Sequence, residues 1–175
     1  SASITFTLDT TAPTVAMNDI ALTNDPTPEL TGTVADTTAT VVVTIGSTDY
    51  PATNNGDGTW TLADDTVAAL VEGSTTVTVT ATDPAGNAGT DTGTVFVDST
   101  APNAPSVVLT NDSGSDGSDL ITNDGSLTVT PDEAGNAIEY SSDDATWSGT
   151  PPALSDGSNT VYVRELDPAG NPSPS

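Results

Sequence analysis

Acidic side chains recur in this sequence at positions where they could bind a divalent cation. Asp9 and Asp98 each stand shortly before an Ala-Pro pair, in LDTTAP and VDSTAP, and Asp83 and Asp167 each open the sequence DPAGN. Calcium takes six to eight oxygen ligands in flexible geometry, and carboxylates, asparagine amides and backbone carbonyls all supply them. Three or more carboxylates at one point are costly without a counter-charge. The chemistry predicted is therefore calcium binding, with solvated turn aspartates as the alternative.

The charge balance makes a neutralising partner necessary and excludes several functions. The 175 residues include 25 acidic side chains, one basic side chain (Arg164), and no histidine or cysteine, for a net charge of −24. Such a chain repels itself, and nucleic acid and anionic membranes are poor partners because both need basic patches. No histidine, lysine or cysteine is present to activate a serine or threonine, so we expect no enzyme activity. A high-salt environment is the other explanation of the charge.

The chain contains neither disulfides nor a hydrophobic segment of membrane-spanning length. Without cysteine, stability must come from another source, and bound metal is one candidate. No stretch approaches 18 consecutive apolar residues, and no signal-peptide pattern occurs at the start. We expect a soluble piece of a longer protein that is not inserted in a membrane.

An internal repeat organises these motifs. The sequence LTND occurs at 22–25 and 109–112, D-x-T-W at 57–60 and 144–147, and DPAGN at 83–87 and 167–171. With the aspartates at 9 and 98, four markers keep their order at offsets of 84 to 89 residues. This spacing indicates a tandem duplication.

Strands must position these residues, because the apolar pattern has period two. In residues 74–83, valines and alanine alternate with threonines, and 40–46, 58–62, 126–130, 137–142 and 159–166 also read as strands. Turn residues separate them, and only residues 65–73 suggest a helical turn. About seven short strands per repeat predict an all-β chain of two tandem Ig-like (Greek-key) β-sandwiches.

The repeats are out of phase with the ends of the chain. DPAGN at 83–87 precedes a final strand that ends at Asp98, whereas only PSPS follows DPAGN at 167–171. Residues 1–9 match the strand that the second repeat lacks. We therefore predict three parts: 1–9, the last strand of another repeat; 10–98, sandwich 1; and 99–175, sandwich 2, which lacks its own last strand. Residues 1–9 would complete a sandwich by folding back or, in preference, by head-to-tail donation between molecules. The alternative is a frayed leader beside an open edge strand.

The candidate calcium ligands fall into two junctions and one loop. The first junction joins Asp9 to loops of sandwich 1. The second joins Asp98 to loops of sandwich 2 and to the far end of sandwich 1. The loop 111–124 alternates aspartates with glycine and serine, although a flexible linker has the same composition. At the first junction the candidates are Asp9, Asp36, Asp83 and Asn87. At the second junction they are Asp98, Asp132, Asp167 and Asp25, and the nearby residues Asn24, Asp64, Asp65, Glu133 and Asn171 could contribute. In the loop they are Asp112, Asp116, Asp119 and Asp124.

The aromatic residues offer a weaker candidate site. Trp60 and Trp147 occupy the same place in the two repeats and are predicted to be packing anchors rather than carbohydrate platforms. An exposed surface of Trp147, Tyr140 and Tyr162 is the only aromatic cluster that the sequence offers for binding. DPAGN itself can be ordinary turn chemistry.

The ordered set of motifs resembles the bacterial Ig-like extender repeats of giant calcium-dependent surface adhesins of the RTX and biofilm-associated type. The resemblance rests on D-[TS]-T-A-P at 9–13 and 98–102, on both DPAGN sequences, and on LTND with ITND at 109–124. AIEYSSDDATW at 137–147 and SNTVYVRELDPAGN at 158–171 add to it. It implies export by type I secretion, anchoring of the parent chain at the outer membrane, and an extracellular location on the bacterial surface.

The resemblance also implies a role for the repeats. Calcium at the junctions would keep neighbouring repeats extended, so that they project a ligand-binding module from the cell. The alternative is an Ig-like sugar- or protein-binding module of the same kind of adhesin, and a weaker one is an accessory domain of a secreted hydrolase. The two repeats differ from one another, which leaves open whether both are plain spacers.

Overall fold

The computed structural model describes residues 1–175 and divides the chain into two compact units, Ser1–Ser99 (unit 1) and Thr100–Ser175 (unit 2). Both units contain β-strands and no helix, so the predicted all-β class is confirmed. No helix that is long and apolar enough to cross a membrane is formed.

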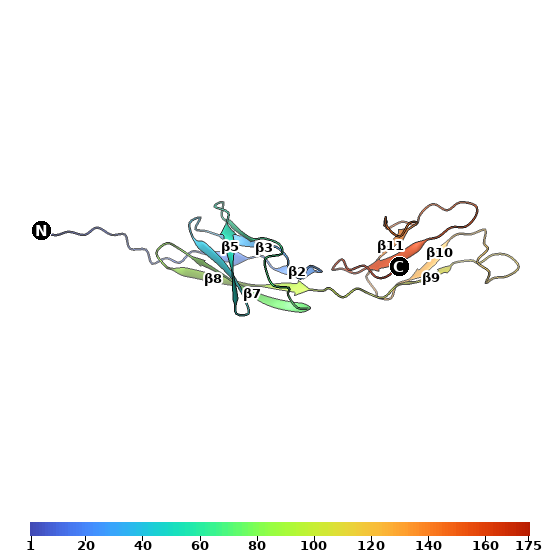
Figure 1. The fold of residues 1–175 in the computed structure, drawn as a ribbon, viewed down its shortest axis with the longest axis horizontal. Helices are drawn as coiled ribbons and strands as arrows, with labels where there is room; N and C mark the ends of the chain where they lie inside the picture. The colour runs from blue at the N-terminus through green and yellow to red at the C-terminus, as the bar shows by residue number, and fades with distance from the viewer. The chain divides into compact units, whose positions relative to one another are not determined.

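Unit 1 has eight strands arranged in two layers (Figure 1). They follow the order β1-β3-β6-β5-β4-β7-β8-β2. Strand β5 belongs to both layers, because its first part pairs with β4 and its last two residues pair with β6. Strand β2 lies parallel to β8, whereas the other pairs are antiparallel. The strands are β1 (Val15–Met17), β2 (Ile20–Thr23), β3 (Leu30–Val34), β4 (Thr40–Ile45), β5 (Thr48–Asn54), β6 (Thr59–Leu62), β7 (Gly73–Thr82) and β8 (Ala88–Val97).

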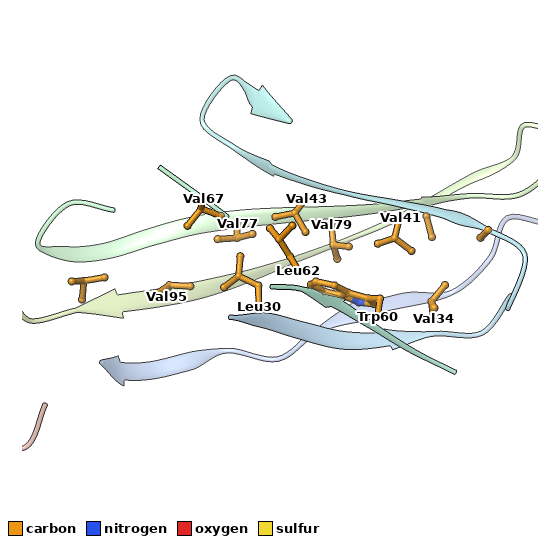
Figure 2. Close-up of a cluster of buried hydrophobic side chains, with 13 residues drawn as sticks. Leu30, Val34, Val41, Val43, Trp60, Leu62, Val67, Val77, Val79 and Val95 are labelled. Carbon is orange, nitrogen blue, oxygen red and sulfur yellow. The ribbon is translucent and has the colours of Figure 1, made fainter. Parts of the chain in front are cut away.

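The core of unit 1 lies between these layers. Val77, Val79 and Ala81 on β7 are fully buried, as their alternation with threonine predicts. Figure 2 shows side chains of the two layers pointing toward one another, with Trp60 among them. The Trp60 ring is fully buried, and its Nε1 donates a hydrogen bond of 2.9 Å to the carbonyl oxygen of Ala16. Its predicted role as a packing anchor is confirmed.

The helical turn suggested for residues 65–73 is wrong. Asp65 has a φ of 59°, outside the right-handed helical region. Its amide donates to the Thr27 carbonyl, and the Leu70 amide donates to the Pro26 carbonyl, both within 2.9 Å. Val67 is buried in the core. These bonds to residues 26–27 hold the segment as an irregular connection.

Unit 2 has four strands in two separate two-stranded sheets. Strand β9 pairs with β10, and β11 pairs with β12, antiparallel in both cases. Three of these confirm the strands expected at 126–130, 137–142 and 159–166. Apart from Pro102, Val163 is the one apolar residue of unit 2 that is buried to the degree of the unit 1 core. The strands are β9 (Ser106–Leu109), β10 (Leu127–Thr130), β11 (Ala137–Ser141) and β12 (Tyr162–Leu166).

Candidate functional site

The two DPAGN sequences fold into turns of the same geometry. Asp83 Oδ1 accepts a hydrogen bond of 2.8 Å from the Asn87 amide, and Asp83 Oδ2 accepts one of 2.8 Å from Asn87 Nδ2. Asp167 and Asn171 repeat both bonds, at 2.8 and 2.9 Å. The two aspartates are 7% and 8% exposed. The repeated sequence therefore places two nearly buried carboxylates in the same local structure.

Hydrogen bonds lower the pKa of both of these carboxylates. The Asn87 side chain lowers the pKa of Asp83 below its usual value, and the backbone amides of the turn act in the same direction. Burial raises the pKa of Asp167, but the bonds from Asn171 and Gly170 outweigh burial and the net shift is downward. Each carboxylate already serves as a turn cap, in agreement with the turn alternative.

The first predicted junction is partly assembled in unit 1. Asn87 Nδ2 donates a hydrogen bond of 3.2 Å to the Asp9 carbonyl oxygen, which brings Asp9 beside the DPAGN turn. Asp9 Oδ1 accepts from the Thr11 amide at 3.0 Å. Asp36 Oδ1 accepts from the amide and the hydroxyl of Thr38, at 2.8 and 2.7 Å. Asp9, Asp83 and Asn87 therefore lie together, while the described side-chain bonds of Asp36 stay within its own turn.

A local pattern that the sequence analysis missed explains many of the aspartates. An aspartate followed two residues later by serine or threonine accepts bonds from that residue's amide and hydroxyl, as Asp36 does. These bonds form Asx turns, in which the side chain mimics a backbone turn. The aspartates in this arrangement are Asp25, Asp36, Asp57, Asp116 and Asp124. The described bonds all use Oδ1.

Two carboxylates meet at the end of unit 1 where the chain leaves β8. Partial loss of solvent raises the pKa of the exposed Asp64 carboxyl. The negative charges of Asp25, whose side chain contacts Asp64, and of Asp65 raise this pKa further. Thr27 Oγ1 donates to both Asp25 and Asp65, at 3.2 and 2.8 Å. The charge of Asp25 therefore opposes ionisation of Asp64.

Asp98 lies at the same end of unit 1. Its amide donates a 2.8 Å bond to the Thr23 carbonyl, and Thr23 Oγ1 accepts a 3.0 Å bond from the Asp25 amide. The structure thus places Asp25 beside the Asp64 carboxyl and connects the backbone of Asp98, the other predicted ligand, to Asp25 through Thr23. The predicted cluster of Asp98 with Asp132 and Asp167 involves both units and stays a prediction.

The loop 111–124 contains one carboxylate oxygen without a partner. Asp112 Oδ2 accepts a 3.0 Å bond from the Leu120 amide, whereas Asp112 Oδ1 is buried and unpaired. Asp116, Asp119 and Asp124 each accept a bond from the amide two residues further on. Thr122 Oγ1 ties the two sides of the loop by donating to the Asn111 carbonyl at 2.7 Å. An unpaired buried acceptor in an acidic loop fits a cation, which would supply the missing partner.

A fully buried glutamate organises the loop that carries Asp132. Glu165 on β12 accepts hydrogen bonds from the Asp132 amide, from the Glu133 amide at 3.4 Å and from Asn136 Nδ2 at 2.9 Å. Asp132 Oδ2 accepts from Asn103 Nδ2 at 2.9 Å. Sequence reasoning missed Glu165, although it lies in phase with the buried Val163. A charged residue on the inward face of a strand was the available signal.

The only basic side chain is committed to its neighbours. Arg164 Nη2 lies 2.7 Å from Glu139 Oε2, directly across the β11–β12 pair. Its guanidinium carbon lies 4.2 Å from the centre of the Trp147 ring, a cation–π contact. Trp147 is half-buried, and the arginine covers a face of its ring. This arrangement favours packing over sugar binding.

The described carboxylates do not form a complete metal site by themselves. No group of three or more of them is arranged to hold an ion within residues 1–175. The donor types nevertheless suit calcium, since the Asp25–Asp64 contact and the unpaired Asp112 oxygen both lack a counter-charge.

Comparisons with known proteins give one family and several solved structures. The family model for the bacterial Ig-like domain matches residues 2–99, whereas no curated protein matches the chain. A tetra-tandem repeat in the extending region of a large adhesion protein is 21% identical (TM-score 0.44), covering 95% of this chain and 48% of that one. A Ca²⁺-stabilised, ice-binding adhesin of an Antarctic bacterium is 19% identical (TM-score 0.48), with 94% and 47% covered.

The chain spans about half the length of these two solved adhesin chains. The Ig1-2 module of the Drosophila receptor protein tyrosine phosphatase DLAR is also similar, at 11% identity and a TM-score of 0.41, with 94% of this chain and 96% of that one covered. The family match extends over more than half of the chain and coincides with the two-layered β-structure of unit 1. The chain belongs to the bacterial Ig-like domain family.

Proposed function

We propose that the chain is a pair of structural extender repeats from a secreted bacterial cell-surface adhesin, stiffened by calcium. The observation that carries this proposal is the contact between Asp25 and Asp64 at the end of unit 1. The chain has 25 acidic residues and one basic residue, and that residue, Arg164, is paired with Glu139. The chain therefore offers no free basic side chain to neutralise the Asp25–Asp64 contact.

The residues proposed to hold calcium come from the acidic motifs of the sequence and lie at three places. At the end of unit 1 they are Asp25 and Asp64 with Asp98, joined at the boundary by Asp132 and Asp167 of the next repeat. At the start of unit 1 they are Asp9, Asp36, Asp83 and Asn87. In the loop 111–124, Asp112 would bind through its unpaired oxygen, and Asp116, Asp119 and Asp124 through oxygens that their turns leave unused.

Calcium would convert repulsion between neighbouring repeats into attraction. Without the ion, carboxylates at a boundary disfavour close approach of two repeats. An ion that binds only the folded, closely placed form stabilises that form by mass action. Extracellular calcium would then stiffen a chain that is pliable in calcium-poor cytoplasm. This mechanism requires no catalytic residue, and we propose no enzyme activity.

The location and partners proposed here rest on the family and on the repeated motifs. Membership of the bacterial Ig-like family and the order of the repeated motifs support an extracellular place in an adhesin exported by type I secretion and anchored at the outer membrane. Its partners would be calcium ions, neighbouring repeats of the same chain and, through residues 1–9, a strand-accepting repeat. A sugar-binding role receives less support, because Arg164 covers a face of Trp147.

Thermal unfolding with and without calcium tests the proposal. Extracellular calcium modules bind with dissociation constants of roughly 10⁻⁴–10⁻³ M, so about 10 mM calcium suffices. At 10 to 100 times the dissociation constant, one site adds about 1.4–2.7 kcal/mol to the free energy of unfolding. For a unit of this size, that corresponds to a rise in Tm of at least about 6 °C. Potassium chloride at matched ionic strength is the control for simple screening. Equal melting temperatures in calcium, chelator and potassium chloride would refute the calcium proposal.

A further inference from the structure

The turn between β5 and β6 contains the one Asn-Gly pair of the chain. The sequence NNGDG at 54–58 joins the two strands, and Asn55-Gly56 within it is the only such pair in the sequence. Both residues are exposed, and Gly56 has a φ of 78°, a left-handed conformation that favours glycine. Because glycine has no side chain to shield its nitrogen, that nitrogen can reach the preceding asparagine side chain more easily than in any other residue. The turn therefore carries a candidate site of spontaneous modification.

The reaction available to this pair is deamidation of Asn55. The Gly56 nitrogen forms a bond to Cγ of Asn55 and loses its proton to water, while the bond from Cγ to Nδ2 breaks and ammonia leaves. Water then opens the resulting cyclic imide at either of its carbonyl groups, giving aspartate or isoaspartate. The net change converts an amide and a water molecule into a carboxylate and ammonium. No enzyme, metal or oxidant takes part.

The side chain of Asn54 holds the attacking nitrogen in the folded chain. Gly56 N donates a hydrogen bond of 3.1 Å to Asn54 Oδ1. Asn54 Nδ2 donates in turn to the carbonyl oxygens of Asp36 and Ala39, both at 2.9 Å, which fixes the Asn54 side chain to the turn between β3 and β4. The Gly56 N–H is thereby committed to Asn54, and its loss of a proton to water requires this bond to break.

Two threonine hydroxyls hold the leaving group. Asn55 Nδ2 donates to Thr59 Oγ1 at 2.9 Å and to Thr61 Oγ1 at 3.1 Å. The Asn55 backbone amide also donates to the Thr59 carbonyl oxygen, at 3.0 Å. The Asn55 side chain is thus fixed against β6, and rotation of its Cγ toward the Gly56 nitrogen would break both hydroxyl contacts.

We propose that Asn55-Gly56 is a fold-gated deamidation site, which the folded β5–β6 hairpin protects and which reacts when the hairpin opens or the chain unfolds. A reaction confined to an open form proceeds in proportion to the equilibrium population of that form. This reactivity does not depend on the proposed extender function. Calcium would slow the reaction only to the extent that it stabilises the fold of unit 1.

The product would weaken the hairpin that Asn55 supports. Thr59 Oγ1 already donates its proton to Asp57 Oδ1 at 2.6 Å, so it cannot also donate to a carboxylate at position 55. The new negative charge would lie in the same turn as that of Asp57. Thr59 begins β6, whose Trp60 is fully buried in the core. A deamidated chain should therefore refold to a less stable unit 1, and the modification would record time that the chain has spent unfolded.

Peptide mapping of the full chain by mass spectrometry, after incubation with and without urea, tests this proposal. Conversion at Asn55 should be at least tenfold faster in urea, which corresponds to an opening free energy of about 1.4 kcal/mol. Asn87, Asn103 and Asn136, each followed by alanine, are internal references that should convert more slowly than Asn55 in urea. Equal rates at Asn55 in the folded and the unfolded chain would overturn the proposal, as would an Asn55 that converts no faster in urea than the references.

Asn54→Ala tests the role of the hydrogen bond to Gly56. This variant frees the Gly56 amide and should speed conversion at Asn55 in the folded chain by about two- to tenfold, the range that one net hydrogen bond supplies. Asn18→Ala is the matched control, because it removes the same group from an exposed side chain outside the hairpin, where Asn18 Nδ2 donates to Thr31.

Urea unfolding of both variants separates this local effect from a general loss of stability. The measured free energies of unfolding give the rise in conversion rate that a larger unfolded population alone would cause. A rate for Asn54→Ala that exceeds this rise, with no such excess for Asn18→Ala, supports gating by Asn54. If conversion in Asn54→Ala rises no more than its unfolded population does, the contact between Asn54 and Gly56 does not protect the site and the proposal is overturned.

Discussion

Replacing Glu165 with glutamine should destabilise unit 2 more than any other single charge removal. The Glu165 carboxylate is fully buried and accepts bonds from the amides of Asp132 and Glu133 and from Asn136 Nδ2. Glutamine keeps one acceptor oxygen, but its amide group then faces a hydrogen-bond donor. A hydrogen bond to a charged group contributes about 1.5–3 kcal/mol, and a buried donor left unpaired costs a further 1–3 kcal/mol or so. We expect the free energy of unfolding of unit 2 to fall by roughly 2.5–6 kcal/mol.

Hydrogen exchange measured by mass spectrometry localises this effect. In the Glu165→Gln chain, the amides of residues 132–133 should exchange faster, and the Tm of unit 2 should fall by about 10 °C or more, at 4–8 °C per kcal/mol. Glu139→Gln is the matched control on the neighbouring strand. Its side chain is 23% exposed and pairs with Arg164, so its loss should cost no more than about 1 kcal/mol.

The comparison of these two variants can refute the reasoning. If Glu165→Gln is as stable as the wild type to within about 0.5 kcal/mol, the scatter expected for surface substitutions, the buried carboxylate does not hold the 131–136 loop. Equal protection of the residue 132–133 amides in both variants would lead to the same conclusion.

Two further substitutions have effects that depend on pH. Asp64→Asn should raise the Tm at pH 7 in chelator, because the raised pKa of Asp64 means that its charge opposes folding. This gain in Tm should shrink as the pH falls through that pKa. In calcium, the variant should gain less stability from the ion than the wild type does. A variant that is less stable than wild type in chelator would contradict this. Asp167→Asn should lower the free energy of unfolding by about 1 kcal/mol at pH 7 and by progressively less in acid. The lowered pKa of Asp167 gives a stabilisation that is present at neutral pH and is lost as the carboxyl protonates. If urea unfolding gave the same difference at every pH, this prediction would be contradicted.

Strands that alternate cleanly were predictable from sequence, and those with broken patterns were not. The valines of β7 alternate with threonine because one face packs on the core. Strand β5 was not predicted, because Pro51 interrupts the alternation of apolar and polar residues and because the strand divides its pairing between β4 and β6. The two tryptophans at matching positions also have different surroundings, since Trp60 is buried among side chains of both layers and Trp147 lies beneath Arg164.

The candidate site was less predictable, because its contacts are long-range. Asp25 and Asp64 are 39 residues apart in sequence, and their contact depends on how the segments after β2 and β6 approach one another. Asp112 and the DPAGN aspartates were identified from composition and repetition. Their roles differ, however, because the backbone amides of a turn satisfy Asp83 and Asp167 and leave one oxygen of Asp112 unpaired. The Asx turns involve neighbours only two residues away, so a search for Asp-x-Ser/Thr would have found them.

The claim that calcium stiffens the pair of repeats is tested most directly by the distribution of distances between the two units, measured by pulsed electron–electron double resonance. The chain has no cysteine, so spin labels can be attached at the exposed Ser47→Cys in unit 1 and Ser142→Cys in unit 2 without removing any native thiol. The calcium account predicts a narrow distribution in calcium and a broad one in chelator, with potassium chloride at matched ionic strength resembling chelator. Distributions of equal width in calcium and chelator would contradict it.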